Sequence, residues 1–230
     1  MRFLNNRSCL ATNKLATLYL ILLLAGGFAA CRERATTGNK TGTTPDAISF
    51  HEGDDQYIAI NTKLSLVTWK GSMQIGNNNH RGYVYISKGE LRLDNGQLRG
   101  GAVEVDMKTI EDLDHRADNN LIKHLKDPDF FDVTKFPTST ISITGSGADS
   151  STPGHSIIFG NLTIKGITNP VSFPARIAVA DGLVTANGRL VIDRTKWDVR
   201  YKSGKFYDLL ADQTMSDSIE FDIKIVAWKR

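Results

Sequence analysis

Apolar and polar residues alternate along most of the chain after residue 55. At 219–225 every second residue is apolar and the residues between them are charged, and the same pattern recurs at 103–107. A period of two is typical of a strand with one buried and one solvated face. By this criterion the sequence predicts strands at 56–60, 64–75, 83–86, 90–93, 97–107, 141–143, 156–164, 167–179, 183–192 and 219–225.

Two dipeptides indicate how neighbouring strands are joined. Asn95-Gly96 and Asp181-Gly182 each separate two predicted strands and readily supply the positive φ angles of a tight antiparallel hairpin. Each strand has one apolar face and no second hydrophobic layer is predicted, so closure into a barrel would bury that face and remove exposed edges. We therefore expect an all-β fold, an extended antiparallel β-barrel of about eight strands with one short helix. A two-sheet sandwich is the alternative.

Other residues predict irregularities within two of these strands. Pro170 and Pro174 cannot donate a ladder hydrogen bond, so they predict a bulge, an edge or a strand end within 167–179. Asn187-Gly188 predicts a second turn or a bulge within 183–192. Both segments are therefore expected to be less regular than the strand at 219–225.

The stretch 121–143 departs from the strand pattern. Leu121, Ile122 and Leu125 have helical spacing, and this helix should end before Pro128 because proline disfavours α geometry in the residue preceding it. Two adjacent rings, Phe130 and Phe131, then lead into the strand at 141–143. A short amphipathic helix followed by two aromatic residues most simply closes one opening of the barrel, with both rings reaching inward.

The first 55 residues have the composition of an export and tether segment. Residues 1–30 combine a basic start with an apolar run at 15–24, which is typical of a signal peptide. They end in small residues before Cys31, as in a bacterial lipobox, with Phe28 in place of the usual aliphatic residue. We expect lipidation of Cys31, the only cysteine after residue 30; an ordinary secretory signal is the alternative. The polar stretch 31–55 predicts a flexible tether, and 56–230 a single folded domain.

Charge and motif content remove several function classes from consideration. The chain carries 28 Lys and Arg against 25 Asp and Glu, and removal of the signal with its three basic residues leaves the two counts equal. No basic cluster interleaved with aromatic residues follows, so nucleic-acid binding is not expected. The five histidines have no metal-ligand spacing, and no catalytic or nucleotide-binding motif is present. We therefore expect neither a metal site nor an enzyme.

Three longer motifs resemble those of a known family. They are His-Leu-Lys-Asp-Pro-Asp-Phe-Phe-Asp-Val at 124–133 with Lys-Phe-Pro at 135–137, Gly-Asn-Leu-Thr-Ile-Lys-Gly-Ile-Thr at 160–168, and Ile-Asp-Arg-Thr-Lys-Trp at 192–197. Their sequence and order resemble the YceI-like family of exported bacterial proteins, from about residue 57 to 228. Trp69-Lys70-Gly71 and Gly89-Glu90-Leu91 further resemble the lipoprotein branch found in Bacteroidetes-type bacteria.

The resemblance implies a lipocalin-like barrel whose elongated apolar interior holds a polyisoprenoid or similar long-chain amphiphile, without catalytic residues. Interior rings would then supply most of the affinity. The candidates for the wall are Trp69, Phe130, Phe131, Phe159, Phe173, Trp197, Phe206, Tyr207 and Phe221. The alternative for each ring is that it fills a dry core.

The stretch 197–210 combines four aromatic residues with a basic set, Arg200, Lys202 and Lys205, and with Ser203-Gly204 as a hinge. It is interpreted either as a lid over the mouth of the barrel or as an ordinary long connection. In the lid interpretation the three basic side chains would meet an acidic head group, such as a diphosphate.

Three functions follow from the sequence. The first is a membrane-anchored lipid carrier or store. The second is an accessory of quinone or isoprenoid metabolism that passes its lipid to a partner, and the third is a structural or stress-related surface protein with a filled core. Arg32 after Cys31 predicts the outer membrane or its periplasmic face. The sequence leaves the identity of the lipid and the oligomeric state open, a dimer included.

Overall fold

The structure is a computed structural model that describes residues 48–51, 54, 56–76, 79–114 and 120–229. All of them belong to the second of two compact units in the chain, Gly42–Arg230. The predicted signal peptide, Cys31 and the tether up to residue 47 lie outside the described residues. Among the helices of the described part, none has the length and hydrophobicity needed to cross a membrane.

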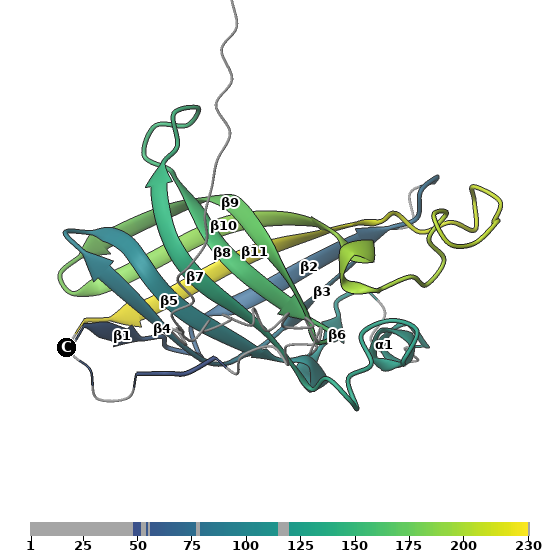
Figure 1. Cartoon of the computed structure of the whole chain (residues 1–230), viewed down its shortest axis with the longest axis horizontal. Helices are drawn as coiled ribbons and strands as arrows, with labels where there is room; N and C mark the ends of the chain where they lie inside the picture. The colour runs from purple at the N-terminus through teal and green to yellow at the C-terminus, as the bar shows by residue number, and fades with distance from the viewer. Residues whose placement is uncertain (1–47, 52–53, 55, 77–78, 115–119, 230) are drawn as a thin grey trace, which may run out of the picture. The chain divides into compact units, whose positions relative to one another are not determined.

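One antiparallel sheet makes up the domain (Figure 1). Its eleven strands are β1 (Tyr57–Ala59), β2 (Leu66–Ser72), β3 (Asn79–Val84), β4 (Ile86–Asp94), β5 (Gln97–Asp106), β6 (Glu111–Asp112), β7 (Thr138–Ala148), β8 (Ser156–Ile164), β9 (Ile167–Ala180), β10 (Leu183–Asp193) and β11 (Ser218–Trp228). Three helices lie in the connections between strands: the 3-10 helices η1 (Met107–Thr109) and η2 (Arg194–Trp197), and the α-helix α1 (Asn120–Lys126). The all-β prediction with one short helix is confirmed.

The strand pairing runs round in a ring. Each strand from β7 to β11 pairs with its neighbour in sequence, and β11 also pairs with β2 near the start of the domain. Some consecutive strands belong to one extended segment. A turn interrupts the segment of β1 and β2, a single residue that of β3 and β4, and η1 that of β5 and β6. The eleven strands therefore arise from eight segments, which agrees with the expected barrel and not with the sandwich.

The ring is completed by Ile60, which follows β1. Its backbone N–H donates to the carbonyl oxygen of Gly89 in β4 at 2.9 Å, and the residue forms an antiparallel bridge with Ala227 in β11. The first segment thus pairs with both of its neighbours at this end of the barrel. Because a paired edge has no free row of donors and acceptors, this closure leaves little of the sheet edge exposed.

The hairpins occur where the dipeptides predict them. Asn95 and Gly96 between β4 and β5 have φ angles of 50° and 76°, and Asp181 and Gly182 between β9 and β10 have 49° and 77°. Two successive positive φ angles are those of a type I′ turn, whose twist matches the twist of the strands it joins. In Figure 1 these hairpins lie at one end of the barrel, and α1 and the loop after η2 lie at the other.

The irregularity predicted within 167–179 is present as an edge, whereas the one predicted within 183–192 is absent. β9 contains both prolines and pairs with β8 from Ile167 to Ala175, but it pairs with β10 only from Ala175 onward. Pro170 and Pro174 therefore lie where β9 has a neighbour on one side only, so the missing N–H removes no hydrogen bond from β10. The expected turn at Asn187-Gly188 is absent, since β10 pairs with β11 continuously across both residues.

The helix α1 and the two rings after it cover one end of the barrel. Leu125 is buried, and its carbonyl oxygen accepts a hydrogen bond from the N–H of Phe131 at 3.2 Å. The chain turns between these residues, so Phe130 and Phe131 both point inward, with ring centroids 4.8 Å apart in an edge-to-face arrangement. The predicted junction between helix and sheet is confirmed.

Part of the predicted tether contacts the domain. The backbone N–H of His51 donates to Glu90 Oε2 at 2.9 Å, and its Nδ1 lies 2.7 Å from Glu90 Oε1. The His51 ring stacks on Tyr57 at 3.9 Å. Because Glu90 is buried and a buried carboxylate needs partners, these contacts extend the folded region before residue 56.

Candidate ligand-binding cavity

An apolar cavity of about 160 Å³ lies inside the barrel. Side chains from nine strands and from α1 line it, and almost all of them are aliphatic or aromatic. An enclosed apolar cavity of about 150 Å³ stays dry and binds a benzene-sized guest. The interior therefore has room for an apolar group, although its volume is small for a long chain at rest.

The cavity is long and narrow. On β5 it is lined both by Leu98, near the hairpin end, and by Val105, near the other end of the strand. These two residues are separated by seven steps of extended chain, or roughly 23 Å at about 3.3 Å per step. The lining continues to Leu121 and Leu125 of α1. Such a shape suits a slender chain better than a compact ligand.

Inward-facing glycines keep the interior open. A Cβ built on Gly82 would lie 2.5 Å from an atom of the Trp69 indole, and one on Gly188 would lie 2.9 Å from the Phe173 ring. Both rings therefore lie close to the backbone of a neighbouring strand, in space that a side chain on the glycine would otherwise occupy. At Gly71, which also lines the cavity, a Cβ would meet nothing within 4 Å.

Five of the predicted wall residues line this cavity. They are Trp69 on β2, Phe173 on β9 and Phe221 on β11, together with Phe130 and Phe131 after α1. Trp69 and Phe221 are paired across β2 and β11. The sequence thus identified side chains from distant parts of the chain that the fold brings together.

The placement of Phe159 in the wall is wrong. Its side chain is 46% exposed, whereas the preceding Ile158 is 2% exposed and lines the cavity. On β8 the inward set is Ile158, Leu162 and Ile164, so the period of two sends Phe159 outward. There its ring lies over Gly147 of β7, where a Cβ would be 3.5 Å from it, and covers a strand position that has no side chain.

Three other predicted wall residues also lie outside the cavity. Trp197 on η2 is buried, but it packs between η2 and β8, where its Nε1 donates to the carbonyl oxygen of Leu162 at 3.0 Å. Phe206 and Tyr207 are 45% and 48% exposed and line an outer pocket instead. These two residues belong to the loop between η2 and β11, which no strand pairing directs inward.

The outer pocket lies beneath this loop, at the same end of the barrel as α1. It has a volume of about 710 Å³ and a mainly polar lining that includes Gln74, Lys205, Asp208 and Asp217. Met215 and Ser216 line both the outer pocket and the internal cavity. We call the layer formed by Met215, Ser216, Asp217 and Arg194 the partition, because it separates the apolar interior from the polar pocket.

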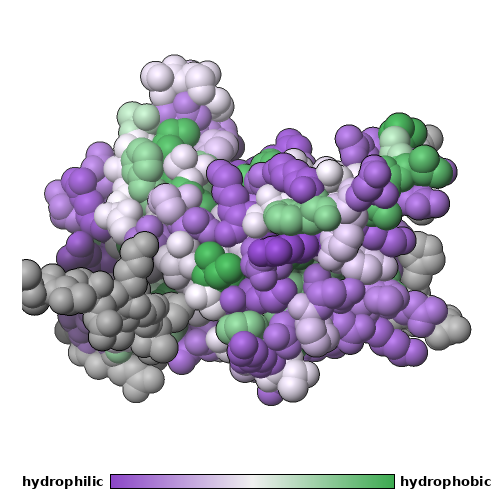
Figure 2. Space-filling model, turned by 45° about the vertical axis from the view of Figure 1, so that its right-hand side comes forward, coloured by the Kyte–Doolittle hydropathy of each residue, from purple (hydrophilic) through white to green (hydrophobic). Residues whose placement is uncertain are grey.

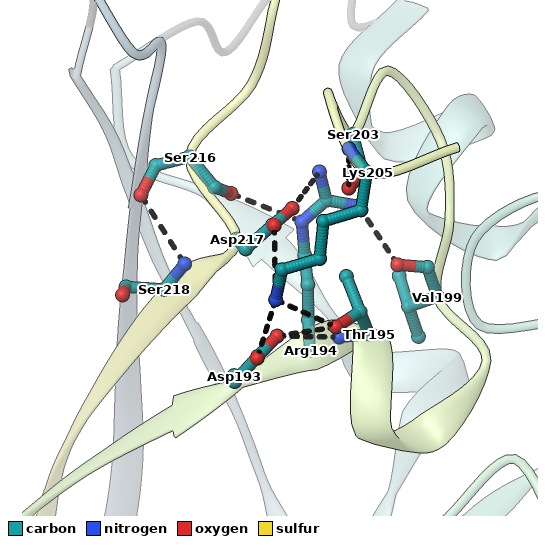
Figure 3. Close-up of polar contacts among 9 residues, drawn as sticks. All are labelled: Asp193, Arg194, Thr195, Val199, Ser203, Lys205, Ser216, Asp217 and Ser218. Carbon is teal, nitrogen blue, oxygen red and sulfur yellow. Dashed lines mark hydrogen bonds and ion pairs between the residues drawn. The ribbon is translucent and has the colours of Figure 1, made fainter. Parts of the chain in front are cut away.

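Arg194 is the charged residue that lines the internal cavity (Figure 3). Its side chain is 1% exposed, its Nε donates to the Ser216 carbonyl oxygen at 3.0 Å, and its Nη1 donates to the Val199 carbonyl oxygen at 2.9 Å. Its Nη2 lies 3.4 Å from Asp217 Oδ1. Burial lowers the pKa of Arg194, although Asp217 and Asp193 oppose this shift. The guanidinium thus joins both ends of the loop to η2.

The basic residues predicted to bind a head group are already paired or lie elsewhere. Lys205 lines the outer pocket, and its Nζ lies 2.7 Å from Asp193 Oδ2 and 3.3 Å from Asp217 Oδ2. The hydrogen bond with Asp193 raises the pKa of Lys205. Arg200 pairs with Asp198 at 2.5 Å, and Lys202 lies over the Tyr201 ring at 5.5 Å. Of the three, only Lys205 lies beside the partition.

The sequence contained a signal for Arg194 that the prediction did not use. Leu190 and Ile192 both point inward from β10, and Arg194 continues this set at the next step of two. A basic residue at an inward position after a strand indicates either a buried ion pair or a polar end of the cavity. The sequence analysis named Arg194 only as part of the motif at 192–197.

The outer surface at the α1 end is mainly hydrophilic, in contrast to the apolar interior. Figure 2, which brings the α1 end forward, shows hydrophilic residues over most of this face and hydrophobic ones in separate patches. Among the described residues, no group of three or more His, Cys, Asp or Glu is placed to hold a metal ion. The apolar cavity and its partition are therefore the strongest candidate for a site in this part of the chain.

Known proteins resemble the chain in sequence and in fold. A UPF0312 protein of Azotobacter vinelandii is 31% identical over 106 residues, which are 42% of this chain and 52% of the relative. A UPF0312 protein of Shewanella oneidensis is 29% identical over 110 residues, which are 45% and 55%. The chain therefore spans about half the length of the curated relatives it matches.

Solved structures share the fold at low sequence identity. Burkholderia cenocepacia BcnA superposes with a TM-score of 0.60 at 20% identity, over 73% of this chain and 99% of BcnA. A polyisoprenoid binding domain from Saccharophagus degradans superposes with a TM-score of 0.55 at 9% identity, over 75% and 98%. Residues 59–227 match the YceI-like domain, which is most of the chain. The protein is therefore a member of the YceI-like domain family.

Proposed function

We propose that the protein binds a long-chain lipid, a polyisoprenoid or a similar amphiphile, with its chain along the interior of the barrel. The observation that carries this proposal is the narrow apolar cavity that runs from the hairpin end to α1. The shared fold of the polyisoprenoid binding domain from Saccharophagus degradans supports it. A carrier or store needs no catalytic group, and the proposed role is binding without catalysis.

The energetics favour a chain over a polar ligand. Each five-carbon unit buries on the order of 100 Å² of apolar surface, so at about 25 cal/mol per Å² it contributes roughly 2.5 kcal/mol before entropic terms. A polar ligand would find few partners among the aliphatic and aromatic side chains of the wall. Several isoprenoid units would therefore supply most of the affinity, and the polar partition would orient the end of the chain.

The cavity volume requires the wall to adjust when a long chain enters. Aromatic residues lying on glycines, such as Trp69 on Gly82, already leave the axis free, so adjustment falls on flexible aliphatic side chains. Met107 and Met215 both line the cavity, and unbranched methionine side chains change rotamer more readily than branched ones. We expect the bound protein to keep its strand pairing and to differ mainly in these side chains.

The test is native mass spectrometry of the full chain, purified from bacterial membranes in a mild detergent, followed by extraction and identification of bound lipid. The expected result is one long-chain lipid per protein molecule. A quinone would favour the accessory role in quinone metabolism, and a carrier isoprenoid or fatty derivative would favour storage or transport. A protein that is free of lipid and also fails to bind added geranylgeraniol would be the structural protein with a filled core.

We further propose that the protein is exported and tethered to the outer membrane through lipidated Cys31. The small residues before this cysteine and the polar stretch after it support the proposal. Trp69-Lys70-Gly71 and Gly89-Glu90-Leu91 support a place in the Bacteroidetes-type lipoprotein branch, whereas the relatives named above come from Azotobacter and Shewanella. Membrane fractionation of the wild type and of Cys31→Ser tests the anchor, since loss of lipidation should release the protein into the soluble fraction.

A further inference from the structure

The partition contains two buried polar atoms without a hydrogen-bond partner. They are Nη2 of Arg194 and Oδ1 of Asp217 (Figure 3). The two atoms lie 3.4 Å apart, which is longer than a good hydrogen bond between a guanidinium and a carboxylate. A buried donor and a buried acceptor left unmatched are both unfavourable, so a group that satisfies both would be stabilised there.

Arg194 and Asp217 lie where one end of the proposed lipid would be. Arg194 lines the internal cavity and Asp217 lines the outer pocket, and Met215 and Ser216 line both. A lipid whose chain fills the cavity would therefore place its polar end at the partition when that end points toward α1. At the hairpin end the lining residues include Leu98, Ala175, Ile177 and Ile225, which offer no polar side chain to a head group.

Resting on the proposed lipid-binding function, we infer that Arg194 and Asp217 form a head-group site for a neutral lipid that carries a hydroxyl group, such as a long-chain alcohol or phenol. A hydroxyl both donates and accepts. Placed about 2.8 Å from each atom, it would accept from Arg194 Nη2 and donate to Asp217 Oδ1. An ether or ester oxygen can only accept, so it would leave the carboxylate oxygen unmatched.

The charges around the site disfavour an anionic head group. The positive charges of Arg194 and Lys205, beside the partition, are neutralised by the negative charges of Asp193 and Asp217. The carbonyl oxygens of Ser216 and Val199 take two further donors of Arg194. A diphosphate would bring several negative charges next to Asp217 and Asp208 in the outer pocket, where Lys205 alone supplies a positive side chain.

Arg194 Nη2 and Asp217 Oδ1 are both buried, so a neighbouring side chain must move before a hydroxyl group can reach them. Met215 is this neighbour, since it lines both cavities and is held in the loop by backbone contacts, a bridge with Met73 and a hydrogen bond from its N–H to the Lys202 carbonyl oxygen at 2.8 Å. Its side chain can therefore change rotamer while the loop stays in place. In this state the two atoms are buried, and the polar end of a lipid would reach them by displacing the Met215 side chain.

The experiment compares ligands with the same chain and different ends on the full-length wild-type protein. The probes are geranylgeraniol, its methyl ether and geranylgeranyl diphosphate, with affinities measured by competition against a fluorescent lipid. We expect the alcohol to bind at least about tenfold more tightly than the ether, because a hydrogen bond to a charged group is lost in the ether. The diphosphate should bind more weakly than the alcohol.

The double variant Arg194→Met/Asp217→Leu tests the assignment to these residues. Replacement of a buried ion pair by apolar side chains of similar volume is often tolerated, and the variant should bind alcohol and ether equally. The single variant Asp217→Asn, which keeps the shape of the side chain, should reduce the preference severalfold if the double variant does not fold. The comparison of probes on the wild type requires neither variant.

The outcomes separate this inference from the proposed function. If alcohol and ether bind the wild type with equal affinity, or if the diphosphate binds most tightly, the head-group site is overturned while lipid binding stands. If none of the three probes binds, the proposed function itself fails. An alcohol preference that persists unchanged in the folded double variant would place the head group somewhere other than Arg194 and Asp217.

Discussion

The indole of Trp69 lies against the backbone of Gly82 on the neighbouring strand, so that a Cβ on the glycine would be 2.5 Å from Cζ2 of the indole. The same Cβ would lie 1.8 Å from the carbonyl oxygen of Glu111 on β6. Trp69 and Gly82 are paired across β2 and β3. The absence of a side chain at residue 82 therefore determines where the largest ring of the cavity wall can lie.

Gly82→Ala should be strongly destabilising for its size. The added methyl group must displace both the indole and a backbone oxygen, and overpacking of this kind lowers the free energy of unfolding by about 1–3 kcal/mol. Urea unfolding, followed by tryptophan fluorescence, measures the change. Gly71→Ala on β2 is the matched control, since a Cβ there meets nothing within 4 Å, and its effect should be within about 0.5 kcal/mol. Equal effects of the two substitutions would contradict the packing of Trp69 on Gly82.

Ile158→Ala should destabilise the protein more than Phe159→Ala, although phenylalanine is the larger side chain. Ile158 is buried in the wall, so its truncation should lower the free energy of unfolding by about 2–4 kcal/mol. Phe159 is half exposed on the outer face, and its truncation should cost less than about 1 kcal/mol. The same pair should separate in lipid affinity, with Ile158→Ala the weaker binder. A larger loss from Phe159→Ala would place its ring in the interior after all.

Gly71→Leu should block the α1 end of the cavity without unfolding the protein. The leucine side chain would occupy open space beside the partition, and Gly71 has no positive φ angle that a side chain would strain. We expect the affinity for a long-chain alcohol to fall at least about tenfold while the midpoint of urea unfolding stays close to that of the wild type. Gly71→Ala, which adds a single methyl group, is the control and should bind nearly normally.

Stability in acid should depend on Glu220 on the outer face of β11. Hydrogen bonds from Lys70, at 3.0 Å, and from Arg189 lower the pKa of Glu220 below its ordinary value of 4.5. A carboxyl group whose pKa is lower in the folded state stabilises the protein fully above its unfolded pKa, and this contribution is lost as the pH falls through the folded value. Wild type should therefore lose more stability than Glu220→Gln as the pH falls below about 4.5.

The measurement for this prediction is the free energy of unfolding in urea at a series of pH values from neutral to acid. The difference between wild type and Glu220→Gln should shrink as the pH falls. Lys70→Gln should flatten the acid dependence in the same direction, because its Nζ also bonds Glu220. Two curves that stay parallel through the acid range would show that these contacts do not contribute to stability in solution.

Local sequence patterns predicted most of the fold, because strand alternation and hairpin turns are each determined by residues that are close together in the sequence. Alternation of period two located the strands, and Asn95-Gly96 and Asp181-Gly182 fixed antiparallel hairpins through their φ angles. The continuity of β10 through Asn187-Gly188 was not predictable in this way. There the pairing with β11 overrides the turn preference of the dipeptide, and Gly188 has another purpose, the close approach of Phe173.

The cavity was predicted less well, because ring size was weighted above strand register. Phe159 was chosen for its ring, although its neighbour Ile158 is in register with Leu162 and Ile164. Phe206 and Tyr207 lie in a loop, where no period fixes the direction of a side chain. Arg194 was in register with Leu190 and Ile192, but only the fold shows that its Nη2 and Asp217 Oδ1 remain unmatched.

Ile60 marks a seam in the barrel. At the hairpin end, its bridge to Ala227 joins the first segment to the last, and the three-residue strand β1 joins the first segment to β4. A force that pulls on the residues before Tyr57 acts on the contacts of His51 with Glu90 and then on this short strand, which pairs with β4 at three residues. Detachment of β1 would uncover two strand edges and open a slit in the side of the barrel, far from Arg194, so tension on the chain before the domain would reach the cavity wall directly.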